Sequence, residues 1–171
     1  MNSWHGNGWG HFFPANAHLA TSMSHHFDAV IIPGGSRHVN RLISDPQTAR
    51  FMRGFMEDNK PVALVEGATK ILADADVLAD RTVVSFEDVN DDLAKKDVKL
   101  AEDDIHVDDM LVSSKFADEA LVEKFLKLLE FWKHLDGVAL FFEVLLWAGL
   151  FALLTMLLWR YRDWFVAFAG R

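Results

Sequence analysis

The feature that most constrains this chain is an apolar run near its C-terminus, residues 138–159, in which Glu143 is the only ionisable residue. As an α-helix the run would extend about 33 Å, enough to cross the ~30 Å hydrocarbon core of a bilayer. Trp159, Tyr161 and Trp164 stand at its end, where the aromatic belts of membrane proteins lie. The run therefore predicts one transmembrane helix. A buried core helix is the alternative, which the small size of the domain disfavours because it could hardly surround such a helix.

The charge of the chain is concentrated before this run. The sequence has 17 Lys and Arg against 25 Asp and Glu, a net charge of −8. Within 137–171 the ionisable groups are Glu143, Arg160, Arg162, Asp163 and Arg171. An acidic soluble part repels phosphate backbones, so we expect no nucleic-acid partner. With no cysteine in the chain, disulfides, thiolate metal ligands and a cysteine nucleophile are excluded.

Three regions follow from these patterns. Residues 1–26 form an aromatic and histidine-rich segment, 27–136 an α/β domain, and 137–171 the transmembrane anchor with a short tail. The N-terminus has neither the basic start nor the apolar core of a signal peptide. We therefore expect a single-pass protein of an inner bacterial membrane with its soluble domain on the cytoplasmic side, although Lys and Arg flank the anchor about equally on both sides.

Strand and helix patterns alternate along the α/β domain. A β-branched apolar run predicts a strand within 27–35 that ends in a Gly-rich turn. Similar runs predict strands at 62–65 and 81–86, and shorter ones at 99–101, 105–107 and 111–113. Amphipathic patterns predict helices at 47–58, from the turn after residue 65 to about residue 78, at 86–93 and at 117–135. Such alternation is typical of a mostly parallel sheet in a three-layer α/β fold.

Three motifs in this domain have a combined order that resembles a known family. They are FDAVIIPGG at 27–35, KPVA at 60–63 and ADVLADRTVVS at 75–85. The order is similar to that of the PfpI-type family, the class I glutamine-amidotransferase-like fold of intracellular proteases and deglycases. The resemblance implies a flavodoxin-like sheet. It also implies a nucleophilic cysteine, followed by a histidine, on a strained turn directly after the KPVA strand.

The chain departs from this family at the residues that carry its chemistry. The cysteine position is Glu66 and the histidine position is Gly67. A carboxylate is a far poorer nucleophile towards carbonyl carbon than a thiolate, and glycine offers no base. The resemblance further implies a first strand, helix and strand before residue 27, for which 1–26 has no room. We therefore expect a truncated sheet and a pseudoenzyme, with a hydrolase or deglycase that uses Glu66 as the alternative.

A truncated sheet has an edge of unpaired backbone groups. Such an edge needs cover from the N-terminal segment, a second copy or a partner protein. Trp4, Trp9, Phe12 and Phe13 are the aromatic residues expected to pack across that sheet or against the partner.

Other candidate sites are weaker. Histidines 5, 11, 18, 25, 26 and 38 fit no metal-binding spacing and are interpreted as loop or interface residues. The acidic stretches 87–92 and 102–109 lack the spacing of a calcium loop and are interpreted as solvated turns. Ser85, Ser113 and Ser114 have no histidine at the spacing of a serine-hydrolase elbow.

These patterns together predict a non-catalytic, membrane-anchored accessory subunit that stabilises or assembles a multi-subunit membrane complex. The stretch 154–164 resembles the end of bacterial light-harvesting β-polypeptides, which suggests a photosynthetic antenna or reaction-centre complex. Thr155 stands where that family has its pigment-ligating histidine, so we predict no cofactor of its own and only peripheral pigment or lipid contact through partners. The partners expected are integral membrane subunits and the bilayer. The predicted contact residues are Glu143, Trp147, Trp159, Tyr161, Arg162 and Trp164. For Glu143, snorkelling to the interface is the other interpretation.

Overall fold

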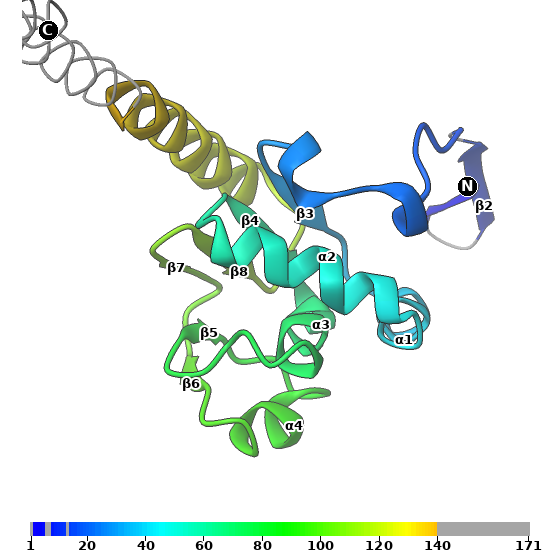
Figure 1. Cartoon of the computed structure of the whole chain (residues 1–171). Helices are drawn as coiled ribbons and strands as arrows, with labels where there is room; N and C mark the ends of the chain where they lie inside the picture. Colours follow the sequence, from blue (N-terminus) through cyan, green and yellow to red (C-terminus); the bar gives the residue numbers. More distant parts are fainter. Residues whose placement is uncertain (1, 6–7, 13, 140–171) are drawn as a thin grey trace, which may run out of the picture. The chain divides into compact units, whose positions relative to one another are not determined.

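A computed structural model of the chain describes residues 2–5, 8–12 and 14–139, with side chains from residue 14 onwards. The chain divides into two compact units, with the boundary in sequence between Leu129 and Glu130. The first unit carries the α/β fold (Figure 1). Of the second, the described part is helical up to residue 139.

The sheet at the centre of the first unit has four strands in the order β3-β4-β8-β7. Its strands are β3 (Val30–Ile32), β4 (Val62–Val65), β7 (Ile105–Asp108) and β8 (Leu111–Ser114). β3, β4 and β8 run parallel, whereas β7 is antiparallel to β8. A separate parallel pair joins β5 (Thr82–Val84) and β6 (Lys99–Ala101). The expected mostly parallel α/β sheet is thereby confirmed.

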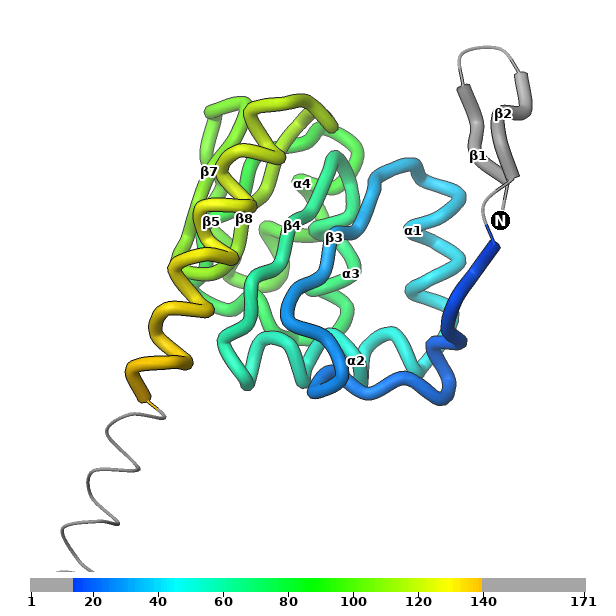
Figure 2. The backbone as a smooth tube through the Cα atoms, turned by 90° about the horizontal axis from the view of Figure 1, so that it is seen from above, coloured from blue at the N-terminus to red at the C-terminus, as the bar shows by residue number. Residues whose placement is uncertain are grey.

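Helices cover both faces of this sheet, because alternate residues of its buried strands are apolar on both sides. On one face, Val62 and Leu64 of β4 pack in a core with α1 (Ser36–Ile43), α2 (Pro46–Glu57), α3 (Thr69–Asp74) and α4 (Asn90–Ala94). On the other face, Ala63 and Val65 pack against Leu121 and Phe125, which belong to a helix that begins at residue 119. Figures 1 and 2 show the sheet between these two layers.

The N-terminal segment contains an antiparallel hairpin and two short 3-10 turns. The hairpin pairs β1 (Asn2–His5) with β2 (Gly8–Phe12). The turns are η1 (Leu19–Thr21) and η2 (Ser24–His26), and they lie against α2. Arg50 of α2 donates hydrogen bonds to the carbonyl oxygens of Leu19 (3.3 Å) and Ser22 (2.9 Å). The segment from residue 18 therefore packs against α2, one of the helices that cover the first face of the sheet, to which Val62 and Leu64 point.

The edge of β3 that faces away from β4 is open. No strand within residues 2–5, 8–12 and 14–139 pairs with it, and Figure 2 shows β3 at the rim of the sheet. Ile31 is paired in register with Ala63, so its side chain points to the same face of the sheet as Ala63, the second face. This side of Ile31 is not covered by the described residues, and the residue is 53% exposed. Among the described residues, β3 and β7 are the two edge strands of this sheet.

Several element boundaries differ from those expected. β3 begins later than predicted, because Phe27 closes η2 through its N–H, and it ends before Pro33, which has no N–H to donate. The Gly-rich turn expected at the end of 27–35 is present at Gly34-Gly35. The helix expected to reach residue 78 ends at Asp74, and the chain turns at Asp76, whose φ is 56°. The helix expected at 86–93 begins only at Asn90.

One helix was not predicted, and the predicted anchor falls outside the description. α1 lies in a stretch to which the sequence assigned no element. No helix within the described residues is long and apolar enough to cross a bilayer. The run 138–159 lies almost entirely beyond residue 139, as do all six of the expected membrane contacts from Glu143 to Trp164.

Candidate functional site

The candidate site is the sharp turn that follows β4. All four residues of β4 are buried, and the chain passes directly into a 3-10 turn, η3 (Glu66–Ala68), and then into α3. Glu66 has φ of 52°, in the left-handed region that costs a non-glycine residue about 1 kcal/mol. The strained turn expected from the resemblance is therefore present, and Glu66 occupies its strained position.

The Gly34-Gly35 turn after β3 is the wall against which Glu66 packs. A Cβ atom added to Gly34 would lie 2.6 Å from the Cβ of Glu66 and 2.8 Å from its Cδ, so no larger residue fits while Glu66 keeps its place. Gly35 is the N-cap of α1 and has φ of 96°, which only glycine adopts readily. The two glycines bring the start of α1 beside the carboxyl group of Glu66.

A cavity of about 360 Å³ opens at this turn. It is lined by Gly35, Ser36, Val39, Asn40, Glu66, Gly67, Lys70, Phe86, Asp88 and Val89. A larger hollow of about 500 Å³ lies along 15–27, and its only ionisable lining residues are His18 and His26. We take the smaller cavity as the candidate site because it contains the strained turn, two carboxylates and a lysine.

Of the charged residues that line the cavity, Lys70 has an ion-pair partner, whereas Glu66 has none among the described residues. The Lys70 ammonium lies 2.6 Å from the Asp92 carboxylate. The hydrogen bond from Lys70, followed by its charge and by a weaker contribution from Lys95, holds the pKa of Asp92 below its ordinary value. The Glu66 side chain has no hydrogen bond or ion pair to any other described residue.

The two positions singled out in the sequence, Glu66 and Gly67, lie together in this cavity. A Cβ on Gly67 would lie 3.3 Å from Val89 Cγ1, so a side chain there would press on the cavity wall. The carboxylate of Glu66 can accept protons or bind cations, whereas Gly67 contributes only backbone. Because the chain has no cysteine, the cavity cannot support thiol chemistry.

Sequence reasoning missed the cavity residues Ser36, Asn40 and Lys70, and it interpreted Asp88 only as part of a solvated turn. Lys70 could have been found, because it follows Glu66 by four residues on a predicted helix, the spacing that places two side chains on one face. Ser36 and Asn40 could not, because α1 was not predicted. Asp88 reaches the cavity through a turn whose shape depends on Asn90, which accepts a hydrogen bond from the Phe86 N–H at 2.9 Å.

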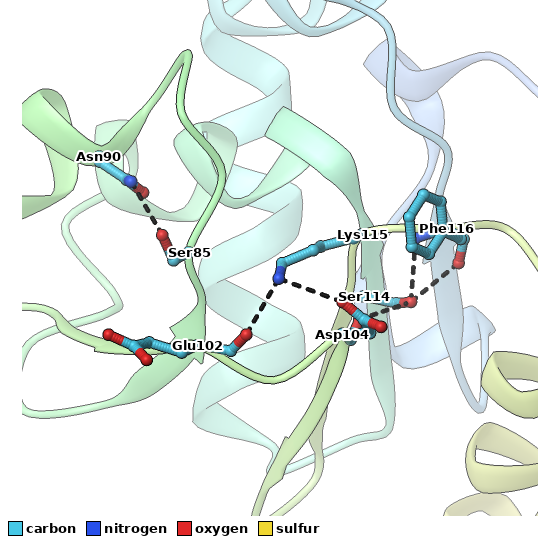
Figure 3. Close-up of polar contacts among 7 residues, drawn as sticks. All are labelled: Ser85, Asn90, Glu102, Asp104, Ser114, Lys115 and Phe116. Carbon is cyan, nitrogen blue, oxygen red and sulfur yellow. Dashed lines mark hydrogen bonds and ion pairs between the residues drawn. The ribbon is translucent and has the colours of Figure 1, made fainter.

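The three serines considered in the sequence have structural partners, and Figure 3 shows those of Ser85 and Ser114. Ser85 Oγ accepts a hydrogen bond from Asn90 Nδ2 at 2.9 Å. Ser114 Oγ donates to the Phe116 carbonyl at 2.8 Å and accepts from the Phe116 N–H at 3.1 Å. Ser113 is buried and accepts from the Val84 N–H at 2.9 Å. None of the three lines the cavity at Glu66.

The histidines and acidic turns form no metal site among the residues described, where no group of three or more His, Cys, Asp or Glu side chains could hold an ion. Within the stretch 102–109, the Asp104 carboxylate accepts from Lys115 at 3.1 Å (Figure 3). The rings of His25 and His26 stack edge to face, with centroids 4.2 Å apart. His5 and His11, and the aromatic residues at positions 4, 9, 12 and 13, lie where no side chains are described.

Known proteins share this fold and part of this sequence. The sequence profile of the DJ-1/PfpI family matches residues 7–130. The putative cysteine protease YraA of Bacillus subtilis (strain 168) is 31% identical over 67 residues, which are 39% of this chain and 39% of that protein. The chain thus spans well under half the length of this curated relative.

Solved structures show the same architecture at lower identity. A two-domain protein of Anabaena variabilis, with DJ-1/ThiJ/PfpI-like and ferritin-like domains, is 23% identical and superposes with a TM-score of 0.57, covering 67% of this chain and 39% of its own. Drosophila melanogaster DJ-1beta is 22% identical, with a TM-score of 0.56 and coverage of 67% and 61%. Schizosaccharomyces pombe DJ-1 is 21% identical, with a TM-score of 0.53 and coverage of 63% and 56%.

Proposed function

Because this chain belongs to the DJ-1/PfpI family but has a glutamate at its strained turn, we propose that it is a non-catalytic, membrane-anchored accessory subunit that stabilises or assembles a multi-subunit membrane complex. The observation that carries the proposal is Glu66 itself. It occupies the strained position, packs against Gly34, and belongs to a chain without cysteine. The fold keeps the turn while the residue expected to attack a substrate is replaced.

The exposed edge of β3 supports a role in a complex. Paired strands satisfy their backbone groups and bury both faces, whereas β3 has an open edge and an exposed Ile31 among the described residues. Such an edge invites another polypeptide to add to the sheet. A partner that lies here would complete the sheet, which is a structural role.

The sequence of residues 138–159 supports the membrane anchor. Its length and composition suit a single transmembrane helix, and the soluble domain would then stay close to the bilayer. The resemblance of 154–164 to light-harvesting β-polypeptides is the support for a photosynthetic complex as the host, with pigment or lipid contact through the partners.

Co-purification tests this proposal. The tagged full-length chain is extracted from its native membranes in a mild non-ionic detergent, after washing with alkaline carbonate to remove peripheral proteins. We expect the chain to stay in the membrane fraction and to be recovered with integral membrane subunits in a fixed stoichiometric ratio. Release by carbonate, or recovery as a monodisperse monomer, would contradict the proposal.

A hydrolase or deglycase that uses Glu66 is the second candidate, which the open cavity beside the carboxylate favours. The purified chain is tested on aldehyde adducts of amines and thiols and on peptides, with Glu66→Gln as the control. We expect no turnover above the rate measured with Glu66→Gln. Turnover that this substitution abolishes would establish the second candidate and remove the first.

A further inference from the structure

The cavity at the strained turn has an excess of negative charge. Glu66 and Asp88 both line it, while its one lysine, Lys70, is neutralised at 2.6 Å by Asp92. The Glu66 side chain is partly buried and has no partner among the described residues. A carboxylate removed from part of its water and left without a counter-charge favours a cationic ligand, because the Coulomb attraction strengthens as the surroundings become less polar.

The start of α1 faces the same cavity, and its N–H groups would favour an anion. This attraction for an anion is weaker than the attraction of Glu66 for a cation. A helix N-terminus carries the equivalent of about half a positive charge, whereas an ionised Glu66 carries a full negative charge and lies directly against Gly34 at that terminus. An anion placed at α1 would therefore touch the Glu66 carboxylate, so the balance excludes anionic ligands.

The remaining walls define the rest of the ligand. Val39, Phe86 and Val89 offer apolar surface, and Asn40 and Ser36 offer neutral polar groups. A volume of about 360 Å³ is at the small end of ligand pockets in proteins. These walls suit a short alkyl chain beside a single ammonium group, and an aromatic ring such as Phe86 attracts a cation in addition.

We propose that the cavity at Glu66 binds a small aliphatic primary amine, with its ammonium group on the Glu66 carboxylate and its alkyl chain along Val39, Phe86 and Val89. Asp88, at the exposed mouth, adds attraction for a second ammonium group of a diamine. This site is independent of the role as a membrane subunit. It gives a binding function to a cavity that the loss of the nucleophile left without one.

Calorimetric titration of the full-length chain in non-ionic detergent tests the site, with 1,4-diaminobutane as the probe and butyrate and 1-butanol as ligands of similar size. We expect saturable binding of the diamine, and no saturable binding of butyrate or 1-butanol. Glu66→Gln, which keeps the shape and removes the charge, should weaken diamine binding about tenfold or more, since the ammonium group would then bond to a neutral amide oxygen and not to a carboxylate. Asp88→Asn should weaken it less.

Glu102→Gln is the matched control, because Glu102 is an exposed carboxylate outside the cavity. It should leave the affinity within twofold. Hydrogen exchange of the β4 amides, measured on each variant, verifies that the domain is folded. The proposal is overturned if Glu66→Gln and Glu102→Gln bind the diamine equally, if butyrate binds as tightly as the diamine, or if the diamine shows no saturation up to millimolar concentrations.

Discussion

At the scale of single residues, Glu66 and Gly34 depend on one another. Glu66 adopts the left-handed backbone of the turn although its side chain disfavours it. Gly34 leaves the space into which that side chain packs. The pair therefore predicts a coupled response to substitution that neither residue shows alone.

Gly34→Ala should lower the free energy of unfolding by about 1–3 kcal/mol, because the new methyl group overlaps Glu66. Glu66→Gly should restore most of this loss in the double variant, since it removes the overlapping side chain and suits the positive φ. Pulse proteolysis of the full-length chain across a urea series measures the free energy of unfolding of each variant. Gly67→Ala is the control, where the new methyl group would lie 3.3 Å from Val89 Cγ1 and 3.9 Å from Phe86 Cδ1, and we expect a change within about 1 kcal/mol. Equal stabilities of the Gly34→Ala and Gly67→Ala variants would contradict this account.

The Lys70–Asp92 pair predicts a pH dependence. Lys70 lowers the pKa of Asp92 below 3.8, the ordinary value of an aspartate. Because the folded pKa is the lower one, the pair's contribution to stability is present above pH 3.8 and is lost as the pH falls through the folded pKa. Carboxyl-carbon NMR should show this low pKa.

Lys70→Met should move the pKa of Asp92 back towards 3.8. Lys95→Met should move it less, because Lys95 contributes less than Lys70 to the lowering. A larger shift with Lys95→Met would show that the wrong lysine has been assigned to Asp92.

At the scale of elements, the buried strands were predictable and the turns between them were not. β4 has the bounds expected from its apolar run, because burial on both faces leaves a continuous apolar signal. The bounds of β6 were also as expected, although that strand is largely exposed. α1 was missed because its first residues are polar and its N-cap is Gly35, whose positive φ is not indicated by any pattern in the sequence. The turn after β4 was placed by resemblance, whereas the strain at Glu66 and the cavity require coordinates.

β5 is attached to the main sheet by side chains. The Val84 N–H donates to Ser113 Oγ at 2.9 Å, and the Thr82 N–H donates to Asp108 Oδ2 at 2.6 Å. Ser113 is 1% exposed, so Ser113→Ala should leave the Val84 N–H buried without an acceptor and destabilise the domain by about 1–3 kcal/mol.

Ser85→Ala is the matched control. Ser85 is only partly buried and its hydroxyl accepts from Asn90, which can turn to water. We expect a loss of about 0.5 kcal/mol or less. Pulse proteolysis measures the loss in free energy of unfolding for the two serine variants. A loss in Ser113→Ala no larger than that in Ser85→Ala would contradict the role assigned to Ser113.

At the scale of the whole molecule, the proposal is that the domain acts by completing a complex and not by turning over a substrate. The two outer strands of the sheet provide an internal comparison. Ile31 of β3 and Val107 of β7 both point to the second face, since they are paired in register with Ala63 and Val112. They are 53% and 38% exposed. We place the partner at β3 because Ile31 is the more exposed of the two.

The measurement that tests this claim most directly is the native mass of the detergent-extracted full-length chain, compared between Ile31→Lys and Val107→Lys. A lysine at an open edge discourages strand pairing and apolar contact. We predict that Val107→Lys keeps the mass and subunit composition of the natural complex, whereas Ile31→Lys loses the partner and falls towards the mass of the single chain. Equal masses for the two variants, or a single-chain mass for the natural protein, would contradict the account.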